Sequence, residues 1–355
     1  MKIADVGDLT TQKARGAAKQ VLGSIAKGER PGQAQVQALG ASTLRTAWGK
    51  YRDGHMARKG RSERTIASYA DHVERVMIEW LDTPLAELGK DPGLVAAKHD
   101  EITKRRGPYI ANGTMRTLRA VYNHARKTDR NLPDNPVAAI DWNGEARRDT
   151  ALGLADLPNW FEAVAALDNP IRREFHLFTL LSGCRPTALK EARPDHIRLA
   201  ERALHIPSPK GGAKKAFDIP LSREMICCLA RARRFGARMN PEQASRWIFP
   251  AESASGHLVE QKEDRAVLSK WGNDLRQSFR TLAQAAGVSE FDARLLMNHA
   301  LPGVNAGYIT RHKLLHDHLR MQQEAISRTI MRVPRAAASQ PGPIQAWLGG
   351  KRSAL

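Results

Sequence analysis

The stretch IRREFHLFTLLSGCRPTAL, residues 171–189, decides the fold of the longer part of this chain. Its first part, up to Ser182, is rich in apolar residues and predicts a buried helix. Gly183 predicts the end of that helix, because glycine readily adopts the left-handed conformation that follows a last helical turn. Arg185 comes next, where its guanidinium either serves a functional site or merely neutralises the helix C-terminus. The stretch therefore predicts a helical core that presents a cation at one end.

The charge balance points to a polyanionic partner. The chain has 355 residues, of which 42% are hydrophobic, enough for two or three domains with cores of their own. Lys and Arg number 56 against 37 Asp and Glu, a formal charge of +19 whose self-repulsion a polyanion would relieve. An anionic membrane surface is the alternative, but the basic residues spread from Lys13 to Arg352 instead of forming one amphipathic anchor. Nucleic acid is the favoured partner, and no membrane association is expected.

Cysteine usage and the first residues indicate a cytoplasmic protein. The start, MKIADVGDLTTQKARG, lacks the apolar segment of a secretion signal. The three cysteines, Cys184, Cys227 and Cys228, are an odd number with an adjacent pair, which is a poor disulfide framework. A reducing compartment is therefore expected, with Cys184 as a small packing residue and not a nucleophile.

Helical periodicity and breaks in it predict a mainly α-helical chain of two domains. Ser62 is the expected N-cap of one helix, and a later helix is expected from about Tyr109 to Lys127. Asp156 is expected to cap the first helix of a second, larger block, and helices continue there to about Met331. The expected organisation is a basic leader over 1–40, a helical unit over 41–142, a linker over 143–150, a larger and mostly helical domain over 151–331 and a flexible tail over 332–355.

Basic side chains of the first helical unit are candidates for phosphate contacts. The helix expected over 109–127 buries one side and carries cations on the other, which is either a solvated face or a DNA-binding face. In a basic helical domain the DNA-binding interpretation is favoured. The candidates are Arg58, Lys59, Arg61, Arg116, Arg119, Arg126 and Lys127.

The second block contains one β-hairpin and a set of residues suited to a phosphodiester. ALHIPSPKGGAKKAFDIPL, residues 203–221, alternates around a Gly-Gly turn, which predicts the hairpin and sets Lys210 at its turn. Lys214 and Lys215 lie on the same hairpin and remain alternatives to Lys210 or contacts to DNA. Arg185 and Arg276 supply two guanidinium groups, and two guanidiniums with one ammonium suit the non-bridging oxygens of a phosphate.

The segment LLMNHALPGVNAGYI, residues 295–309, adds a histidine and a tyrosine. His299 precedes Tyr308 by nine residues, in a segment interrupted by Pro302, Gly303 and Gly307. A tyrosine hydroxyl has a pKa near ~10 and is a weak nucleophile unless nearby charge favours the phenolate. The two residues become a candidate site only in combination with the arginines and the lysine.

In this order the motifs resemble those of the tyrosine recombinase, or phage integrase, family. The similar segments are LLSGCRPTAL (180–189), IPSPKGGAKKAFDIPL (206–221), RWIFP (246–250), NDLRQSF (273–279) and LLMNHALPGVNAGYI (295–309). They are similar to the first arginine box, the lysine hairpin, a strand-like landmark, the His-x-x-Arg box and the closing tyrosine box. The unit over 41–142 is similar to the core-binding domain, and the resemblance implies that the domain over 151–331 is the catalytic domain. The resemblance covers nearly the whole chain.

The resemblance implies site-specific DNA recombination without ATP, metal or another cofactor. Tyr308 would attack a phosphodiester and form a 3′-phosphotyrosine, while Arg185 and Arg276 stabilise the charge of the transition state. His299 and Asn273 would add hydrogen bonds to the same phosphate, and Lys210 would protonate the departing 5′-oxygen. The 5′-hydroxyl of a partner duplex then reverses the reaction.

The resemblance also implies the partners of the chain. They are double-stranded DNA attachment sites of a phage or mobile element, clamped between the two domains, and an accessory DNA-bending or directionality protein. Four copies would assemble on the DNA, linked by the helix from about His312 to Met331. That helix places Leu315, Leu319, Ile326 and Ile330 on one stripe, which packs either on its own domain or on a neighbouring copy.

Departures from the family pattern leave two rival functions. Asn273 stands where the family usually has His, and asparagine donates a hydrogen bond but exchanges no proton near neutral pH. Ala188 stands where the family often has an acidic residue that supports the first arginine. A DNA-binding protein of the same fold without catalysis is one rival, and a type IB topoisomerase is the other. The N-terminal part resembles only the end of an arm-binding domain, as a naturally short or truncated form would.

Two further motifs are not interpreted as sites. His312 and His316 share a helical face, but a metalloprotease-like glutamate and a third ligand are lacking, so surface histidines are expected and no metal site is assigned. KGGAKK does not have the spacing of a phosphate-binding P-loop.

Overall fold

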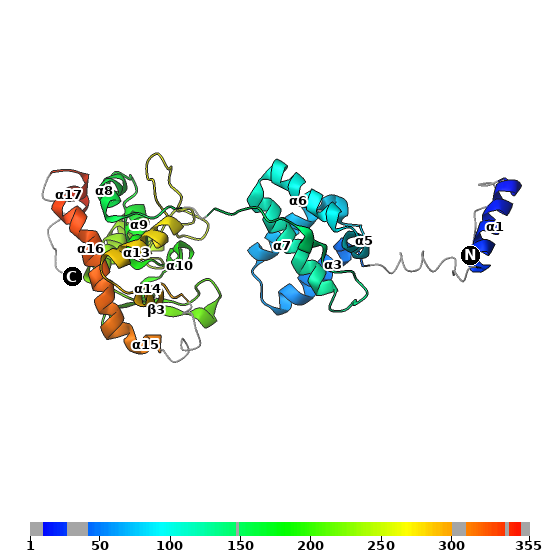
Figure 1. Cartoon of the computed structure of the whole chain (residues 1–355). Helices are drawn as coiled ribbons and strands as arrows, with labels where there is room; N and C mark the ends of the chain where they lie inside the picture. Colours follow the sequence, from blue (N-terminus) through cyan, green and yellow to red (C-terminus); the bar gives the residue numbers. More distant parts are fainter. Residues whose placement is uncertain (1–9, 27–41, 147–148, 300–309, 338–340, 349–355) are drawn as a thin grey trace. The chain divides into compact units, whose positions relative to one another are not determined.

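The computed structural model describes residues 10–26, 42–146, 149–299, 310–337 and 341–348. The chain divides into two compact units, an N-terminal unit of Met1–Arg147 and a C-terminal unit of Arg148–Leu355, which are described separately (Figure 1). Each unit has its own hydrophobic core. Among the described helices, none is both long enough and apolar enough to cross a bilayer.

Over its described residues the N-terminal unit contains helices, connecting loops and one isolated bridge between Thr43 and Pro84, and no strand. It begins with α1 (Thr11–Ala26), which lies within the basic leader expected over 1–40. The elements that follow are α3 (Leu44–Lys50), η1 (Tyr51–Met56), α4 (Glu63–Ala70), η2 (Asp71–Val76), η3 (Ile78–Trp80), α5 (Leu85–Lys90), α6 (Pro92–Arg106), α7 (Pro108–Ala125) and η4 (Pro136–Ala139). α3 and α4 continue into η1 and η2 as π-helical turns, which shift the side-chain register within one continuous rod.

Local sequence signals explain where these helices begin and what they bury. The Ser62 hydroxyl accepts a hydrogen bond from the Thr65 amide at 3.3 Å, which confirms Ser62 as an N-cap. α7 packs against α6 and buries its expected apolar face, with Met115, Leu118 and Val121 fully enclosed. The core therefore forms on one face of α7, and Arg116 and Arg119 remain exposed on the other.

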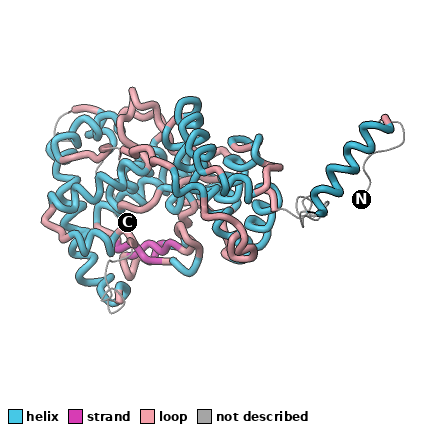
Figure 2. The backbone as a smooth tube through the Cα atoms, turned by 45° about the vertical axis from the view of Figure 1, so that its right-hand side comes forward, coloured by secondary structure: helices cyan, strands magenta, loops and turns pink. Residues whose placement is uncertain are grey.

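The C-terminal unit is a helical assembly with one small sheet (Figure 2). Its first half contains η5 (Leu154–Asp156), α8 (Leu157–Ala165), α9 (Pro170–Ser182), α10 (Pro186–Lys190), η6 (Pro194–His196), β1 (Ile197–Arg198), β2 (Ala203–Ile206), η7 (Ala213–Lys215), β3 (Phe217–Pro220), α11 (Arg223–Met239) and α12 (Pro241–Ala244). Its second half contains α13 (Asn273–Ala285), α14 (Glu290–Leu296), α15 (Arg311–Leu314), η9 (Leu315–Leu319), α16 (Arg320–Ala337) and α17 (Pro343–Leu348). The expected fold class, mainly α with a small sheet, is confirmed.

The central helix of this unit is α9, as its apolar sequence predicts. All residues from Glu174 to Ser182 are buried, and α11, α13 and α16 pack around the helix. Gly183 ends it with φ 58°, in the left-handed region. A Cβ at this position would lie 2.5 Å from the Phe279 ring of α13. Only glycine therefore allows α13 to approach the end of α9 so closely.

The expected hairpin forms two strands of a three-stranded antiparallel sheet in the order β1-β2-β3. Leu204 of β2 is paired with Ile219 of β3, and Ile206 with Phe217. The turn between β2 and β3 contains Lys210 and the short helix η7, which carries Lys214 and Lys215. The segment 246–250, expected to be strand-like, forms only an isolated bridge between Pro250 and His257.

Within the flexible tail expected over 332–355, the described residues are 332–337 and 341–348, and they are mostly helical. α16 extends to Ala337, and α17 buries Ile344 and Trp347 against the core of the C-terminal unit. The Trp347 indole also donates a hydrogen bond to the buried Glu174 carboxylate at 2.7 Å. A Pro- and Gly-rich composition predicted mobility, but two apolar side chains on one helical face are enough to dock this short segment.

Two further expectations are resolved by packing. Leu315, Leu319, Ile326 and Ile330 are all buried within the C-terminal unit itself, so this stripe packs on its own domain. The interpretation in which it docks on a neighbouring copy is wrong for these four side chains. Asp156 stands at the N-terminus of α8, but its carboxylate makes no cap bond there and accepts the Gly153 amide at 2.8 Å instead.

Candidate active site

Arg276 is the centre of the candidate site. It lies on α13, and its side chain is only 8% exposed. The guanidinium donates to the Gly183 carbonyl at the end of α9 and to the Met297 carbonyl at 2.9 Å. It also donates to the His299 Nε2 atom at 2.5 Å. Because a guanidinium has no acceptor, this ring nitrogen must be unprotonated, and His299 is held as a neutral imidazole.

Electrostatics explain why His299 stays neutral. Burial and, to a smaller extent, the nearby guanidiniums of Arg276, Arg185, Arg280 and Arg294 together lower the pKa of His299 to about 4. Burial and the positive charge of Arg185 likewise lower the pKa of Arg276 to about 10. Arg185, Arg276 and His299 are therefore close enough to interact electrostatically. The structure brings together three of the residues expected from the sequence.

No carboxylate is bonded to Arg185 or Arg276 within the described part of the chain. Arg185 precedes α10 with extended backbone angles and is half-buried. Ala188, where an acidic partner would stand, packs against the apolar core instead. Arg276 is supported by backbone carbonyls, which orient the guanidinium but do not cancel its charge. Two neighbouring cations without a counter-ion form a strong binding site for an anion.

The lysine hairpin meets this cluster through Asn298. The Asn298 side-chain amide donates to the Lys215 carbonyl at 3.3 Å, and Asn298 has φ 50° directly before His299. The backbone of the hairpin is thereby fastened beside His299. Lys210, Lys214 and Lys215 are all exposed, and their ammonium groups have no partner among the described residues. Lys210 as the proton donor therefore stays a prediction.

The remaining catalytic candidates are reached less directly. Asn273 is the first residue of α13, exposed, and one turn before Arg276, so both can face the same ligand. Tyr308 lies outside the described residues, within 300–309. The helical spacing in α13 therefore places Asn273 near the cluster. The assignment of Tyr308 as the nucleophile depends on its position in the sequence alone.

Several basic candidates of the N-terminal unit lie near two histidine rings that the sequence did not predict as part of a site. His55 of η1 and His124 of α7 have ring centroids 5.4 Å apart, and Tyr51 stacks on His55 at 5.0 Å. Burial lowers the pKa of both histidines, with further lowering by the cations around them. The cations facing His55 are Lys127, Lys59, Arg61 and Arg58. No sequence pattern links Tyr51 to His124, because they meet only when α7 packs against η1.

The other basic candidates of α7 are engaged in contacts within the protein. Arg116 is bonded to Glu145 at 2.8 Å, and both Arg116 and Arg119 lie over the Trp142 ring. Arg126 is paired with Asp134 at 2.9 Å. Arg116 and Arg119 are exposed, and Arg126 is partly exposed, so contact with DNA stays a prediction for all three. It also stays a prediction for the exposed lysines of the hairpin.

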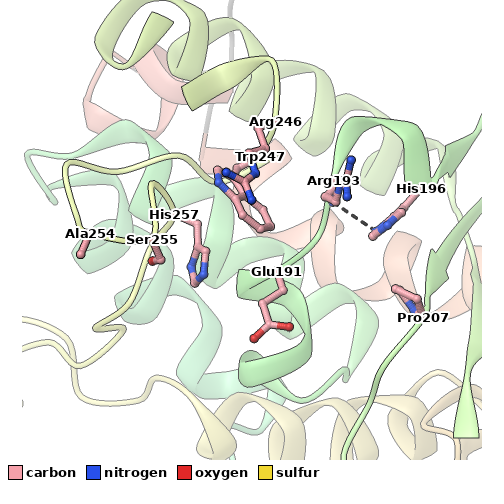
Figure 3. Close-up of a pocket in the computed structure, with 9 residues that line it drawn as sticks. All are labelled: Glu191, Arg193, His196, Pro207, Arg246, Trp247, Ala254, Ser255 and His257. Carbon is pink, nitrogen blue, oxygen red and sulfur yellow. Dashed lines mark hydrogen bonds between the residues drawn. The ribbon is translucent and has the colours of Figure 1, made fainter. Parts of the chain in front are cut away.

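A separate cavity of about 480 Å³ opens on the C-terminal unit (Figure 3). It is lined by Glu191, Arg193, His196, Pro207, Arg246, Trp247, Ala254, Ser255 and His257. None of the described catalytic candidates lines it, so it is distinct from the cluster around Arg276. Over the described residues, no group of three or more His, Cys, Asp or Glu side chains could hold a metal ion.

Comparison with known proteins supports the resemblance to the tyrosine recombinases. The chain is 27% identical over 268 residues to the prophage integrase IntF of Escherichia coli strain K12. That match covers 71% of this chain and 55% of the relative, so the chain spans about half the length of the curated protein it matches. No protein-family model matches the sequence.

Solved structures support the same fold. A lambda integrase tetramer bound to a Holliday junction has a TM-score of 0.59 at 17% identity, with coverage of 87% of this chain and 89% of that chain. The Tn1549 transposon integrase in complex with transposon right end DNA has a TM-score of 0.57 at 12% identity, covering 84% and 99%. At these identities the likeness establishes the fold of the integrases and leaves the chemistry to the residues of the site.

Proposed function

We propose that this chain is a site-specific DNA recombinase, an integrase that cleaves and rejoins DNA through a covalent 3′-phosphotyrosine. One observation carries the proposal: Arg185, Arg276 and His299 lie together, and no carboxylate among the described residues is bonded to them. A phosphodiester supplies the negative charge that this cluster lacks. The similarity to a prophage integrase and the integrase fold support the same function.

The proposed roles follow from the chemistry of each side chain. Arg185 and Arg276 neutralise the non-bridging oxygens as a fifth oxygen approaches phosphorus. The Tyr308 hydroxyl loses its proton to solvent as its oxygen attacks the phosphorus. The bond between the tyrosine oxygen and phosphorus forms, and the bond between phosphorus and the 5′-oxygen breaks. Lys210 gives a proton to that leaving oxygen. The reverse attack by a 5′-hydroxyl needs no ATP, because the phosphotyrosine conserves the energy of the phosphodiester.

His299 and Asn273 complete the phosphate site. With Nε2 occupied by Arg276, the neutral His299 ring has its Nδ1 proton available as a hydrogen-bond donor to a phosphate oxygen. Asn273, exposed at the start of α13, can donate from its side-chain amide. Neither role requires a proton to be exchanged near neutral pH. Asparagine at this position is therefore compatible with catalysis.

The proposed substrates are duplex attachment sites of a phage or mobile element, bound by several copies of the chain. The lambda integrase relative forms a tetramer on a Holliday junction, and we propose the same assembly state here. The exposed cations around His55 and on α7 would follow the phosphate backbone. An accessory DNA-bending or directionality protein is also proposed as a partner.

The decisive experiment traps the covalent intermediate. A duplex with a nick close to the cleavage site loses its short 5′-hydroxyl strand after cleavage, so the protein–DNA adduct accumulates. The full chain should give an adduct resistant to denaturing gel conditions, and Tyr308→Phe should give none. Absence of an adduct on any element-end DNA would favour a DNA-binding protein without catalysis. Relaxation of supercoiled plasmid without an attachment site would favour a topoisomerase.

A further inference from the structure

The guanidinium of Arg311 lies at the junction of three segments. Arg311 is the first residue of α15, and its Nε atom donates to the Leu295 carbonyl in α14 at 2.9 Å. One terminal nitrogen donates to the Asp218 carbonyl in β3 at 2.6 Å. The group also lies over the Phe217 ring, 5.3 Å from its centroid. One side chain therefore joins α14, β3 and α15.

Each of the joined segments leads to a residue of the proposed site. Leu295 lies one turn before His299, whose backbone amide continues the turn by bonding to Arg294 at 2.9 Å. Asp218 follows Lys215 by three residues on the strand that returns from the lysine hairpin. Arg311 itself follows Tyr308 by three residues. The arginine is thus fastened to the supports of His299 and of the hairpin.

Burying the charged guanidinium of Arg311 costs free energy of desolvation, which a purely stabilising role would not explain. Burial lowers its pKa to about 10, although the charge of the Asp218 carboxylate acts in the opposite direction. The hydrogen bonds go to two carbonyl oxygens, and the Asp218 carboxylate is bonded to His205 at 2.7 Å. A charge removed from water without a directly bonded counter-ion contributes little net stability. Its two N–H donors of fixed geometry do, however, set the spacing between two backbones.

We propose that Arg311 is a positioning residue for strand transfer, which holds the His299 turn and the lysine hairpin in register with the start of α15. This inference rests on the proposed function. Arg311 bonds to backbone carbonyls inside the protein, so its effect on the reaction passes through the groups that it aligns. Misplacement of reacting groups by about 1 Å lowers rates by about 100-fold.

Arg172 provides a matched control in the same unit. It is also a partly buried arginine, and it donates to the carbonyls of Glu260 and Lys262, each at 2.8 Å, and to the Glu263 carboxylate at 2.7 Å. These contacts fasten the loop around residues 260–263 to the start of α9, and none of them reaches α14 or the hairpin. Arg172→Ala therefore removes a comparable set of bonds without disturbing the Arg311 junction.

The test compares Arg311→Ala with Arg172→Ala in the full chain. The nicked duplex measures the single-turnover rate of adduct formation, a gel-shift assay measures DNA affinity, and thermal unfolding measures stability. We expect the adduct rate of Arg311→Ala to fall about 100-fold with DNA affinity within about threefold of the unsubstituted chain. Arg172→Ala should lose comparable stability and keep its adduct rate within about threefold.

Two further measurements, rescue by guanidinium ion and the Arg311→Lys variant, distinguish a positioning role from general destabilisation of the fold. Guanidinium ion at millimolar concentration should restore part of the adduct rate of Arg311→Ala, because it can occupy the vacated space, and should have no such effect on Arg172→Ala. Arg311→Lys retains the charge but not the two-donor geometry, so it should remain slow. It also provides the comparison if the alanine variant does not fold.

Equal adduct rates for folded Arg311 variants and Arg172→Ala would overturn the inference. So would full activity of Arg311→Lys, since a point charge would then suffice. If the unsubstituted chain forms an adduct, either result removes the role of Arg311 and leaves the proposed function intact. If the unsubstituted chain forms none on element-end DNA, the proposed function fails, and the inference with it.

Discussion

The arginines of the two units are used in opposite ways. Arg116 and Arg119 of the N-terminal unit are exposed and lie over Trp142, whose own surface is 36% exposed. Arg276 of the C-terminal unit is 8% exposed and is oriented by two backbone carbonyls and a histidine. Exposed cations attract DNA through their combined electrostatic field, which salt screens, so the loss of any one of them has a small effect. A buried guanidinium acts through its geometry, for which no other side chain substitutes.

The largest expected difference between the two units is in cleavage. Arg276→Ala should lower adduct formation on the nicked duplex about 1,000-fold, because it removes transition-state charge and the partner of His299. Arg119→Ala should change the rate less than about threefold. Salt-sensitive DNA binding should persist in both variants, which a gel shift at several salt concentrations would measure.

Arg276→Lys tests the geometric part of that difference. An ammonium keeps the charge but cannot donate to Gly183, Met297 and His299 from one rigid plane, so it should remain close to the alanine variant in rate. A lysine variant with nearly full activity would remove the distinction between the two kinds of arginine. Loss of folding in Arg276→Ala would count against its assignment as a site residue.

Two tryptophans extend the comparison to stability. Trp347 is 6% exposed, packs near Phe161 and donates to the buried Glu174, whereas Trp142 is a surface platform for arginines. Trp347→Ala should lower the free energy of unfolding of the C-terminal unit by about 3–5 kcal/mol. Trp142→Ala should lower that of the N-terminal unit by less than about 1 kcal/mol. Calorimetry of the full chain would separate the two transitions, and equal effects would mean that α17 contributes little.

Local sequence patterns predicted the helical fold, and the family resemblance supplied the candidate site residues, of which Arg185, Arg276 and His299 lie together in the structure. Gly183 could be predicted as a helix end, with Arg185 placed just beyond it, because a last helical turn is often followed by a left-handed residue. The one-turn spacing of Asn273 and Arg276 follows from helical periodicity. The direct bond between Arg276 and His299 joins residues 23 positions apart and depends on how α13 packs against α14. Its consequence, a neutral histidine, could not be derived from residue types alone.

Two features depend on packing that no local pattern reports. The segment of α17 is Pro- and Gly-rich by composition, yet Ile344 and Trp347 find a place in the core. The pair His55 and His124 forms because η1 and α7 are neighbours in space. In both cases the free energy comes from contacts between distant segments. Composition therefore gave no sign of the helix over Pro343–Leu348 or of the histidine pair.

The histidine pair predicts that DNA binding by the chain takes up protons. Burial and the surrounding cations lower the pKa values of His55 and His124, so both rings are mostly neutral at pH 7 in the free protein. Phosphates placed beside the basic residues would raise these pKa values. DNA affinity should therefore increase by about three- to tenfold as pH falls from about 7.5 to about 5.5 at constant salt.

The double variant His55→Gln with His124→Gln should flatten that pH dependence and leave the affinity at pH 7.5 within about twofold. His72 provides a matched control, because its pKa is also lowered by burial but its ring is bonded to Thr117 at 2.8 Å. His72→Gln should retain the pH dependence. An unchanged slope in the double variant would assign the proton uptake elsewhere and weaken the case for this face as the DNA contact.

The smallest expected effect concerns single exposed cations of α7. Each phosphate contact contributes close to one unit to the slope of log affinity against log salt concentration. Arg119→Ala should lower that slope by about one and weaken binding similarly on all sequences. Arg116→Ala should have a smaller effect, because Arg116 is already paired with Glu145 and must leave that carboxylate to reach a phosphate. Equal slopes for both variants and the unsubstituted chain would move the DNA-binding face of this unit away from α7, toward the cations around His55.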